Sequence, residues 1–536
     1  MATADVGVEP QVHRHELLAA LSRGIDLCMA QPMGHVLGQT YIALLLAERS
    51  GLGDDARREV FYTSMLAWAG CHVDSWEQAR WFGDDHRVKG GVRTVDIGDE
   101  HASTAFMARS IGAGLPPAQR RRTLAAFRVD GKRESDEMFG NHRAAATALA
   151  DALGIPEPLR TGVGQVFERW DGKGEPDERC GAESAFSARA ANLGDIVMAI
   201  LRAGGTDAAV AVIRARRGAA LDPDLVDVFC EEADDIFEVL ASVDPFDAAM
   251  KLCPPLDDEL DPVRLDEGLA VLADFVDLKS PSGLGHQSAT AGIADAAADE
   301  FGMAANERRA VRRAALLHDL GRLGVPAAVW ESERALTPAQ SEQIRLHPYF
   351  TETILSPFPG LRPLGRLAGQ HHERLDGSGY PRGIAGEAIS RAGRLLAAAD
   401  LYSAKAERRP YRPPTPVSEL PALLRGEVGD GRLDADAVEA VLSAAGHRRH
   451  RRREWPAGLT GREVEVLRLA ARGRSNADMA AELHVSPKTI GNHLDHIYTK
   501  TGAHNRAMIA VFAMRHGLMV DDQRGPVRER DGSFTP

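Results

Sequence analysis

The sequence has 536 residues, which is enough for about three domains of roughly 100–200 residues each. Aromatic residues make up only 5% of it and β-branched runs are few, so the composition predicts an all-α protein. The formal net charge of −13 argues against non-specific nucleic-acid binding by the whole chain, but basic residues gather between 447 and 518, which is typical of an acidic sensor or enzyme that carries a nucleic-acid-binding domain.

The cysteines and the hydropathy pattern indicate a compartment. Five scattered cysteines with no C-x-x-C pair predict reduced thiols. No apolar run approaches the roughly 20 residues of a membrane helix, and the first residues lack the pattern of a signal peptide. We therefore expect a cytoplasmic protein that does not bind a membrane.

Two stretches of the chain repeat each other in collinear blocks. Residues 167–176 (FERWDGKGEP) match 372–381 (HERLDGSGYP) after a shift of 205 positions, and the same shift pairs Asp195 with Asp400. Earlier in each copy the shift is 251 positions, which pairs His35 with His286. We expect two helical domains of one ancestry, at 11–250 and 260–410, the first with an insertion near 71–140.

The second copy contains a set of imidazole and carboxylate side chains, several of them at predicted helix ends. A helix over 307–317 leads into the pair His318-Asp319, and a helix over 391–406 contains Asp400. Such donors suit divalent metals, and an aspartate after a helix can bridge two ions about 3.5–4 Å apart, as in two-metal phosphohydrolases. A histidine on an apolar face is more often a core residue satisfied by hydrogen bonds, and that alternative stays open for each position. The candidate ligands are His286, His318, Asp319, His347, His371, His372 and Asp400.

The motifs of 318–326 (HDLGRLGVP) and 371–381 (HHERLDGSGYP) resemble the HD-GYP subgroup of the HD phosphohydrolase superfamily. The resemblance covers about 280–406. It implies an all-helical fold, hydrolysis of cyclic di-GMP or a related phosphoester, and two divalent ions, iron or manganese, held by the candidate ligands. It assigns Asp319 as the bridging catalytic residue and Arg322, where the family usually has lysine, as the phosphate contact. The expected substrate-binding residues are Gly379, Tyr380, Pro381 and Arg394.

Some positions depart from the family pattern. Ser403 stands where a second aspartate is common, Thr351 replaces a usual glycine, and Ser282 stands where three-metal members have an acidic ligand. A two-metal site is therefore expected. The rival hypothesis is a metal-dependent ligand sensor with negligible turnover.

The first copy lacks the central donors of the second. Trp68 stands opposite Asp319, and Phe167 stands opposite His372. Apolar side chains cannot hold a two-metal site, so we expect no catalysis in this copy. His35, His142 and Asp195 persist, either as relics held by core hydrogen bonds or as part of a pocket that binds a ligand without cleaving it.

The C-terminal part reads as a helix-turn-helix after a linker over 411–456 with a basic end. Thr460 and Glu463 form a capping box, Gly473 ends the first helix, and Ser486 precedes a longer helix over 488–500. Residues 457–520 resemble the LuxR-type (GerE) output domain, a small four-helix fold that usually acts as a dimer, and Gly491 stands where that family usually has lysine. Residues 521–536 are expected to be a disordered tail. The residues expected to bind DNA are Lys488, Thr489, Asn492, His493 and Lys500.

Together these features predict tandem HD bundles followed by a DNA-binding domain. The predicted function is a homodimeric transcriptional regulator that binds promoter DNA and hydrolyses a cyclic dinucleotide or related phosphoester. The alternative is a transcription factor that senses a metal or ligand without catalysis.

Overall fold

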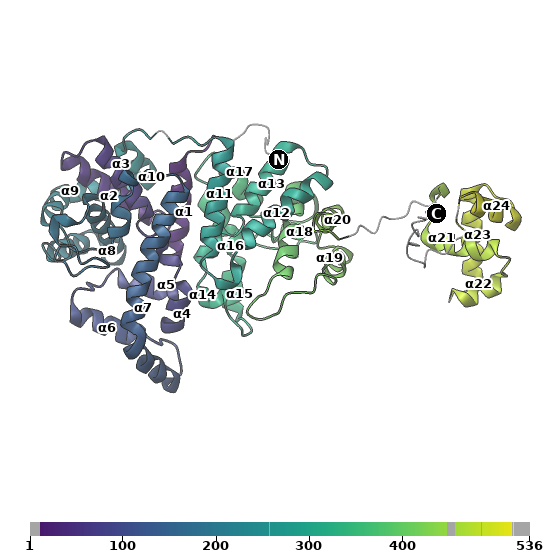
Figure 1. Cartoon of the computed structure of the whole chain (residues 1–536), viewed down its shortest axis with the longest axis horizontal. Coiled ribbons are helices and arrows are strands. Elements are labelled where there is room, and N and C mark those ends of the chain that lie inside the picture. Colours follow the sequence, from purple (N-terminus) through teal and green to yellow (C-terminus); the bar gives the residue numbers. More distant parts are fainter. Residues whose placement is uncertain (1–10, 257, 448–455, 484, 517, 519–536) are drawn as a thin grey trace, which may run out of the picture. The chain divides into compact units, whose positions relative to one another are not determined.

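The computed structural model describes residues 11–256, 258–447, 456–483, 485–516 and 518. They divide into two compact units, one ending at His447 and one beginning at Arg448. Helices and turns form both units, and the described residues contain isolated β-bridges but no strand (Figure 1). The all-α prediction is confirmed. The basic run over 448–453 and the tail over 521–536 lie outside the described residues.

The first copy occupies the N-terminal half of the first unit. Its helices are α1 (Arg14–Cys28), α2 (His35–Arg49), α3 (Asp54–Leu66), η1 (Ala69–His72), α4 (Ser75–Phe82), α5 (Asp85–Val92), α6 (Glu100–Ser110), α7 (Pro117–Ala152), η2 (Glu157–Leu159), η3 (Thr161–Gln165), η4 (Gly181–Glu183), α8 (Phe186–Ala215), α9 (Pro223–Ser242) and α10 (Pro245–Leu252).

The second copy follows in the same unit. Its helices are α11 (Pro262–Asp277), η5 (Pro281–Gly283), α12 (His286–Glu300), α13 (Ala305–Leu317), η6 (Leu320–Gly324), α14 (Ala327–Trp330), α15 (Pro338–Arg345), α16 (His347–Leu355), α17 (Arg362–Ala368), η7 (Gly386–Ala388), α18 (Arg391–Ala406), α19 (Leu420–Gly429) and α20 (Ala435–Ala444).

The bounds of these helices follow the two sequence shifts. Moving α2 and α3 by 251 positions gives the bounds of α12 and α13, and moving the start of α8 by 205 gives the start of α18. The caps repeat as well: the Asp26 carboxylate accepts the Val36 N–H at 3.1 Å, and its counterpart Asp277 accepts the Gln287 N–H at 3.2 Å. Backbone geometry therefore supports the duplication that the sequence predicts.

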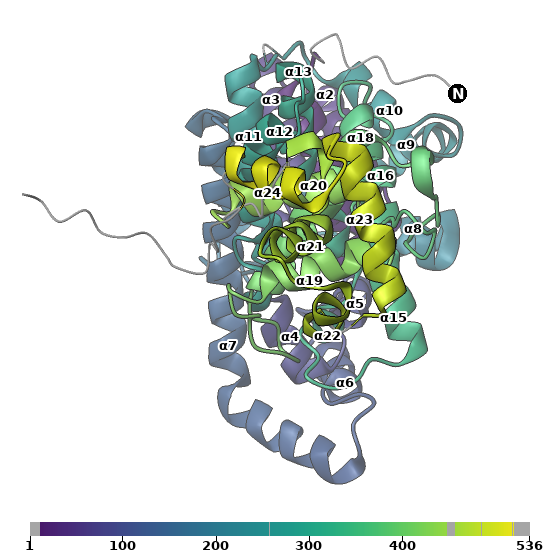
Figure 2. The same cartoon turned by 90° about the vertical axis from the view of Figure 1, so that its right-hand side faces the viewer.

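The extra residues of the first copy form α4, α5, α6 and most of α7. In both views α6 and the first half of α7 extend beyond the rest of the first unit (Figures 1 and 2). Trp81, Phe82, Val88 and Ile111 give this insertion a small apolar core of its own. α6 itself has no fully buried residue, so it covers the bundle rather than filling its core.

The second bundle continues past residue 410, where the sequence placed a linker. α19 and α20 pack on α18, and α20 also packs on α12. Leu424 in α19 and Val438 and Val441 in α20 are fully buried. The linker prediction overlooked the helical spacing of the apolar residues in α19 and α20.

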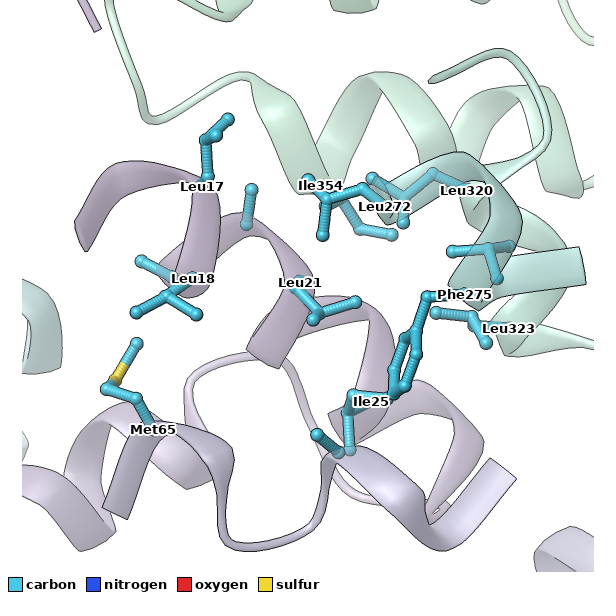
Figure 3. Packing of buried hydrophobic residues seen from close by; sticks show 14 of the residues in the cluster. Leu17, Leu18, Leu21, Ile25, Met65, Leu272, Phe275, Leu320, Leu323 and Ile354 are labelled. Carbon is cyan, nitrogen blue, oxygen red and sulfur yellow. The ribbon is translucent and has the colours of Figure 1, made fainter. Parts of the chain in front are cut away.

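The two copies share one hydrophobic core. Leu21 and Ile25 of α1 lie beside Phe275 of α11 and Leu320 and Leu323 of η6 (Figure 3). Replacing one of these leucines with alanine would cost about 2–5 kcal/mol of folding free energy. The first copy thus supports η6, the segment that follows His318 and Asp319.

One described helix, α8, is long and apolar enough to cross a membrane by length and composition. From the sequence we expected no apolar run of this length. The run in α8 was overlooked because small residues make up much of it. Ala190, Leu193 and Val197 are fully buried against α2 and α3, and Gly205 interrupts the helix with a φ of 82°. Its first half is therefore a core helix of the bundle.

The C-terminal unit, yellow-green in Figure 1, has its own core. Val466, Leu467, Ile490, Ile497 and Ile509 are fully buried in it. Its helices are η8 (Pro456–Gly458), α21 (Gly461–Ala471), α22 (Asn476–Glu482), α23 (Pro487–Thr501) and α24 (Arg506–Arg515).

Candidate metal centre

Helix ends and one helix interior bring the predicted ligand side chains together in the second copy. His286 begins α12 after Gly285, a left-handed residue with a φ of 78°. His318 caps the end of α13, Asp319 precedes η6, and His347 begins α16. His371 and His372 follow α17, and Asp400 lies within α18. All are buried except His372, whose side chain is 22% exposed.

The donors form two groups. His286, His318 and Asp400 make one group, and His347, His371 and His372 make the other; within each group the candidate ligand atoms lie within 4.8 Å of one another. The first group offers imidazole and carboxylate donors, and the second offers imidazole donors. Divalent transition metals accept both kinds of ligand.

Asp319 lies between the two groups with one oxygen towards each. Its Oδ2 is 3.6 Å from Nε2 of both His286 and His318, whereas its Oδ1 is 3.2 Å from Nε2 of His347 and 3.8 Å from Nε2 of His371. A carboxylate in this position can bridge two ions, one held by each group.

Hydrogen bonds fix the imidazole rings so that Nε2 faces the centre. The Nδ1 atoms of His318, His347 and His371 lie 2.7, 2.6 and 2.7 Å from the carbonyl oxygens of the residues three positions earlier. A bond to a carbonyl oxygen places the proton on Nδ1 and leaves Nε2 as an acceptor, the usual state of a metal-bound histidine.

The buried polar atoms also fit a metal centre. Nε2 of His318 is fully buried and has no hydrogen-bond partner among the described residues. An unpaired buried acceptor costs folding free energy, and a bound cation would remove that cost. The residues present therefore fit divalent ions.

Charge coupling within the cluster shifts its pKa values. Burial disfavours the charged form of His286, but hydrogen bonds to Asp400 and Glu407 outweigh it and raise its pKa to about 9. Burial disfavours the charged form of Asp400 as well, but the imidazoles of His286 and His318, 3.3 and 3.7 Å from its Oδ1, hold its pKa well below the usual range. Burial lowers the pKa of His371 to about 3, so that ring stays neutral.

Arg322 sits beside the bridging aspartate. Its guanidinium donates to Oδ2 of Asp319 at 3.1 Å and lies over the Trp330 ring at 4.3 Å. The side chain is buried, and the planar group is thereby held in one orientation. It supplies fixed positive charge at the edge of the ligand cluster.

A loop after His372 brings Tyr380 to the same centre. The Tyr380 and His372 ring centroids are 4.6 Å apart, and the Arg345 guanidinium lies over the Tyr380 ring at 4.7 Å. Gly379 allows this approach, because a Cβ there would lie 2.5 Å from the Glu373 Cα. The predicted Gly379-Tyr380-Pro381 segment thus lies next to the candidate ligands.

Sequence reasoning missed two carboxylates that shape the site. Glu373 accepts the backbone N–H groups of Arg382 and Ile384 at 2.9 and 3.1 Å and so holds the loop. Its counterpart Glu168 makes the equivalent bonds in the first copy. The glutamate shared by the two copies could have pointed to this role in the sequence. Glu407 lies 3.0 Å from Nδ1 of His286 and orients that ring.

Two predicted residues have other contacts. The Arg394 guanidinium donates to the carbonyls of Ile389 and Gly386 and to Asp434, so its donors hold the bundle together. Lys500 donates to Glu463 at 2.8 Å and to the Gly458 carbonyl at 3.1 Å. Both side chains are thus engaged by partners within their own units.

The helix-turn-helix presents a polar face on α23. Ser486 caps the helix by accepting the Thr489 N–H, and Ile490, Leu494 and Ile497 are buried. Lys488 and Asn492 are exposed, and Thr489 and His493 are half-buried. The Gly491 position is open, because a Cβ there meets nothing within 4 Å.

Two family models match the chain. Residues 270–437 match the HD domain, and residues 457–513 match the bacterial regulatory proteins of the luxR family. Both resemblances read from the sequence are confirmed.

Known proteins match over the first unit. The chain is 29% identical over 438 residues to the 3′3′-cGAMP-specific phosphodiesterase 3 of Vibrio cholerae serotype O1, covering 80% of this chain and 94% of the relative. It is 34% identical over 179 residues to a cyclic di-GMP phosphodiesterase of Thermotoga maritima, covering 33% of this chain and 47% of the relative. The crystal structure of a cyclic GMP-AMP-specific phosphodiesterase of V. cholerae superposes with a TM-score of 0.58 at 24% identity, covering 81% of this chain and 98% of that one, and shares the fold.

Proposed function

We propose that this chain, an HD-domain protein with a C-terminal LuxR-family regulatory domain, is a metal-dependent cyclic-dinucleotide phosphodiesterase that regulates transcription. The observation that carries the proposal is the position of Asp319, with one carboxylate oxygen towards each of two groups of imidazole donors. Two divalent ions, iron or manganese, are the proposed occupants.

Divalent ions held by the histidines and aspartates of the two groups would supply Lewis acidity for the phosphoryl oxygens and would activate water as the nucleophile. The Asp319 carboxylate would face both donor groups at once, with one oxygen towards each. Arg322 would bind a phosphate oxygen beside Asp319, and the Tyr380 ring would contact the base or sugar at the rim. Glu407 would keep His286 oriented through its Nδ1 atom.

A 3′,5′-linked cyclic dinucleotide is the proposed substrate class. A relative that matches over nearly its whole length is a 3′3′-cGAMP-specific enzyme, and the shorter matches include both 3′3′-cGAMP-specific and cyclic di-GMP phosphodiesterases. We place 3′3′-cGAMP first because that match spans both copies.

Hydrolysis of 3′3′-cGAMP and cyclic di-GMP by the metal-reconstituted full chain tests this function. Wild type should yield linear or mononucleotide product, and Asp319→Ala should yield none. Asp299→Ala is the matched control, because Asp299 lies in α12 of the same copy but is exposed and pairs with Arg308. Metal binding without hydrolysis of either compound would favour the ligand sensor instead.

We also propose that α23 binds promoter DNA through Lys488, Thr489, Asn492 and His493, as a homodimer in the cytoplasm. The family match over residues 457–513 supports DNA binding, and the exposed polar face of α23 supplies suitable donors. A shift assay with random genomic fragments, followed by sequencing of the retained DNA, would find the target.

A further inference from the structure

A cavity of about 470 Å³ lies in the first copy, where the second copy has its candidate metal centre. The repeat shifts place its lining residues opposite the ligand positions. Its walls include Trp68, His142, Phe167 and Asp195, which correspond to Asp319, His347, His372 and Asp400. The position of the site is kept although its metal donors are not.

An arginine from the insertion supplies the cation in this copy. The Arg93 guanidinium pairs with Asp195, which also lies 2.9 Å from Nε2 of His35. It lies over the Trp68 ring at 4.0 Å, and its side chain is 7% exposed. A fixed guanidinium thus neutralises the aspartate whose counterpart in the second copy is a candidate metal ligand.

A second arginine on the cavity wall has no carboxylate partner. Arg216 is 8% exposed, and its guanidinium donates one hydrogen bond of 3.3 Å to the Thr94 carbonyl. Asp96 acts on it electrostatically, but that carboxylate pairs with Arg169, and Arg216 forms no direct ion pair among the described residues. Burial lowers the pKa of Arg216, which marks a charge that an anion would stabilise.

Aromatic side chains line part of the remaining wall, and charged residues of both signs, among them Lys89, Asp96 and Lys173, line the rest. Phe106, Phe139 and Phe167 line the cavity together with Trp68, and the Phe139 and Phe167 rings are 5.0 Å apart. Apolar walls with a few placed polar groups, at a volume of about 300–1,000 Å³, are typical of sites for small organic ligands.

We propose that the first copy is a metal-independent binding site for a small aromatic organic anion of mononucleotide size. Arg216 holds the acidic group, and the aromatic side chains surround the ring. The proposal does not depend on hydrolysis in the second copy.

Calorimetric titration of the full chain, freed of metal with a chelator, tests the site with GMP and AMP as probes. One of them should bind at about one per chain, and guanosine, adenosine and inorganic phosphate should bind at least about tenfold more weakly, because a charged hydrogen bond and the ring both contribute. Arg216→Gln, which can still donate to Thr94, should weaken binding about 10–100-fold.

Two further variants complete the test. Ser103→Trp should abolish binding by filling the cavity from α6, a helix without fully buried residues. Arg217→Ala is the matched control, because Arg217 pairs with Asp227 outside the cavity and should leave binding unchanged. The proposal would be overturned if the wild type bound no mononucleotide, or if Arg216→Gln and Ser103→Trp bound it as tightly as the wild type does.

Discussion

Nε2 of His347 lies 3.0 Å from Nε2 of His371, while the Nδ1 atom of each ring is bonded to a main-chain carbonyl oxygen. With both protons on Nδ1, two nitrogen lone pairs face each other across this distance. Only an added proton or a cation between them makes the arrangement favourable. The geometry of these two histidines is therefore a reason to expect a metal centre.

Metal affinity should rise with pH between about 6 and 9. The His286 pKa is raised to about 9 in the metal-free protein, so its proton competes with a metal throughout this range. The sign follows from the raised pKa: the charged ring stabilises the metal-free fold at low pH, and that contribution is lost as pH rises towards 9. Affinity should increase up to about tenfold per pH unit, with proton release on binding. Competition with a chelator measures the affinity, and a pH-independent value would contradict the assignment of His286 as a ligand.

Glu407→Gln should weaken metal binding about 10–100-fold without preventing folding. The Glu407 carboxylate lies 3.0 Å from Nδ1 of His286 and is partly exposed, so its loss changes the orientation and basicity of that ring rather than the core. Glu387→Gln is the control, because Glu387 is exposed in η7. Equal affinities for the two variants would show that Glu407 has no part in the site.

Asp85→Ala should destabilise the first unit by about 3–5 kcal/mol, because it leaves the buried Lys89 without its partner. The Asp85 carboxylate also accepts the Ala327 N–H at 2.9 Å and so joins the insertion to the second copy. Its neighbour Asp84 only caps α5, and Asp84→Ala should cost about 0.5–2 kcal/mol. Urea unfolding followed by circular dichroism compares the two; a smaller loss for Asp85→Ala than for Asp84→Ala would contradict this account.

Gly491→Lys should strengthen DNA binding. The position is open and lies in the first half of α23, so the side chain adds a phosphate contact and removes a helix penalty of about 1 kcal/mol. Gly491→Ala separates the two effects, because it gains helix propensity without charge. Fluorescence anisotropy at two salt concentrations should show tighter and more salt-dependent binding for the lysine variant only. Identical salt dependence would place this face of α23 away from the phosphates.

Four of the candidate ligands, His318, Asp319, His371 and His372, could be predicted from the sequence because they belong to two short motifs that follow helices. Arg394 and Lys500 could not be judged in the same way. Both lie on helices, and the partners that engage them, Asp434 and Glu463, are 40 and 37 positions away in sequence.

The boundary of the second bundle shows a different limit. α19 and α20 follow a proline-rich stretch that reads as a linker, and only their packing on α18 shows that they belong to the bundle. For the first copy the sequence left a non-catalytic pocket open as an alternative, but it could not show the buried cation in that pocket, because Arg93 comes from an insertion with no counterpart in the second copy.

The metal content of the full chain, purified without oxygen and reconstituted with iron or manganese, tests the central claim most directly. Plasma mass spectrometry should find about two ions per chain in wild type and in Arg217→Ala, and fewer in Asp319→Ala, because that carboxylate faces both donor groups. Failure of the wild type to retain any metal after reconstitution would contradict the metal centre and with it the proposed phosphodiesterase.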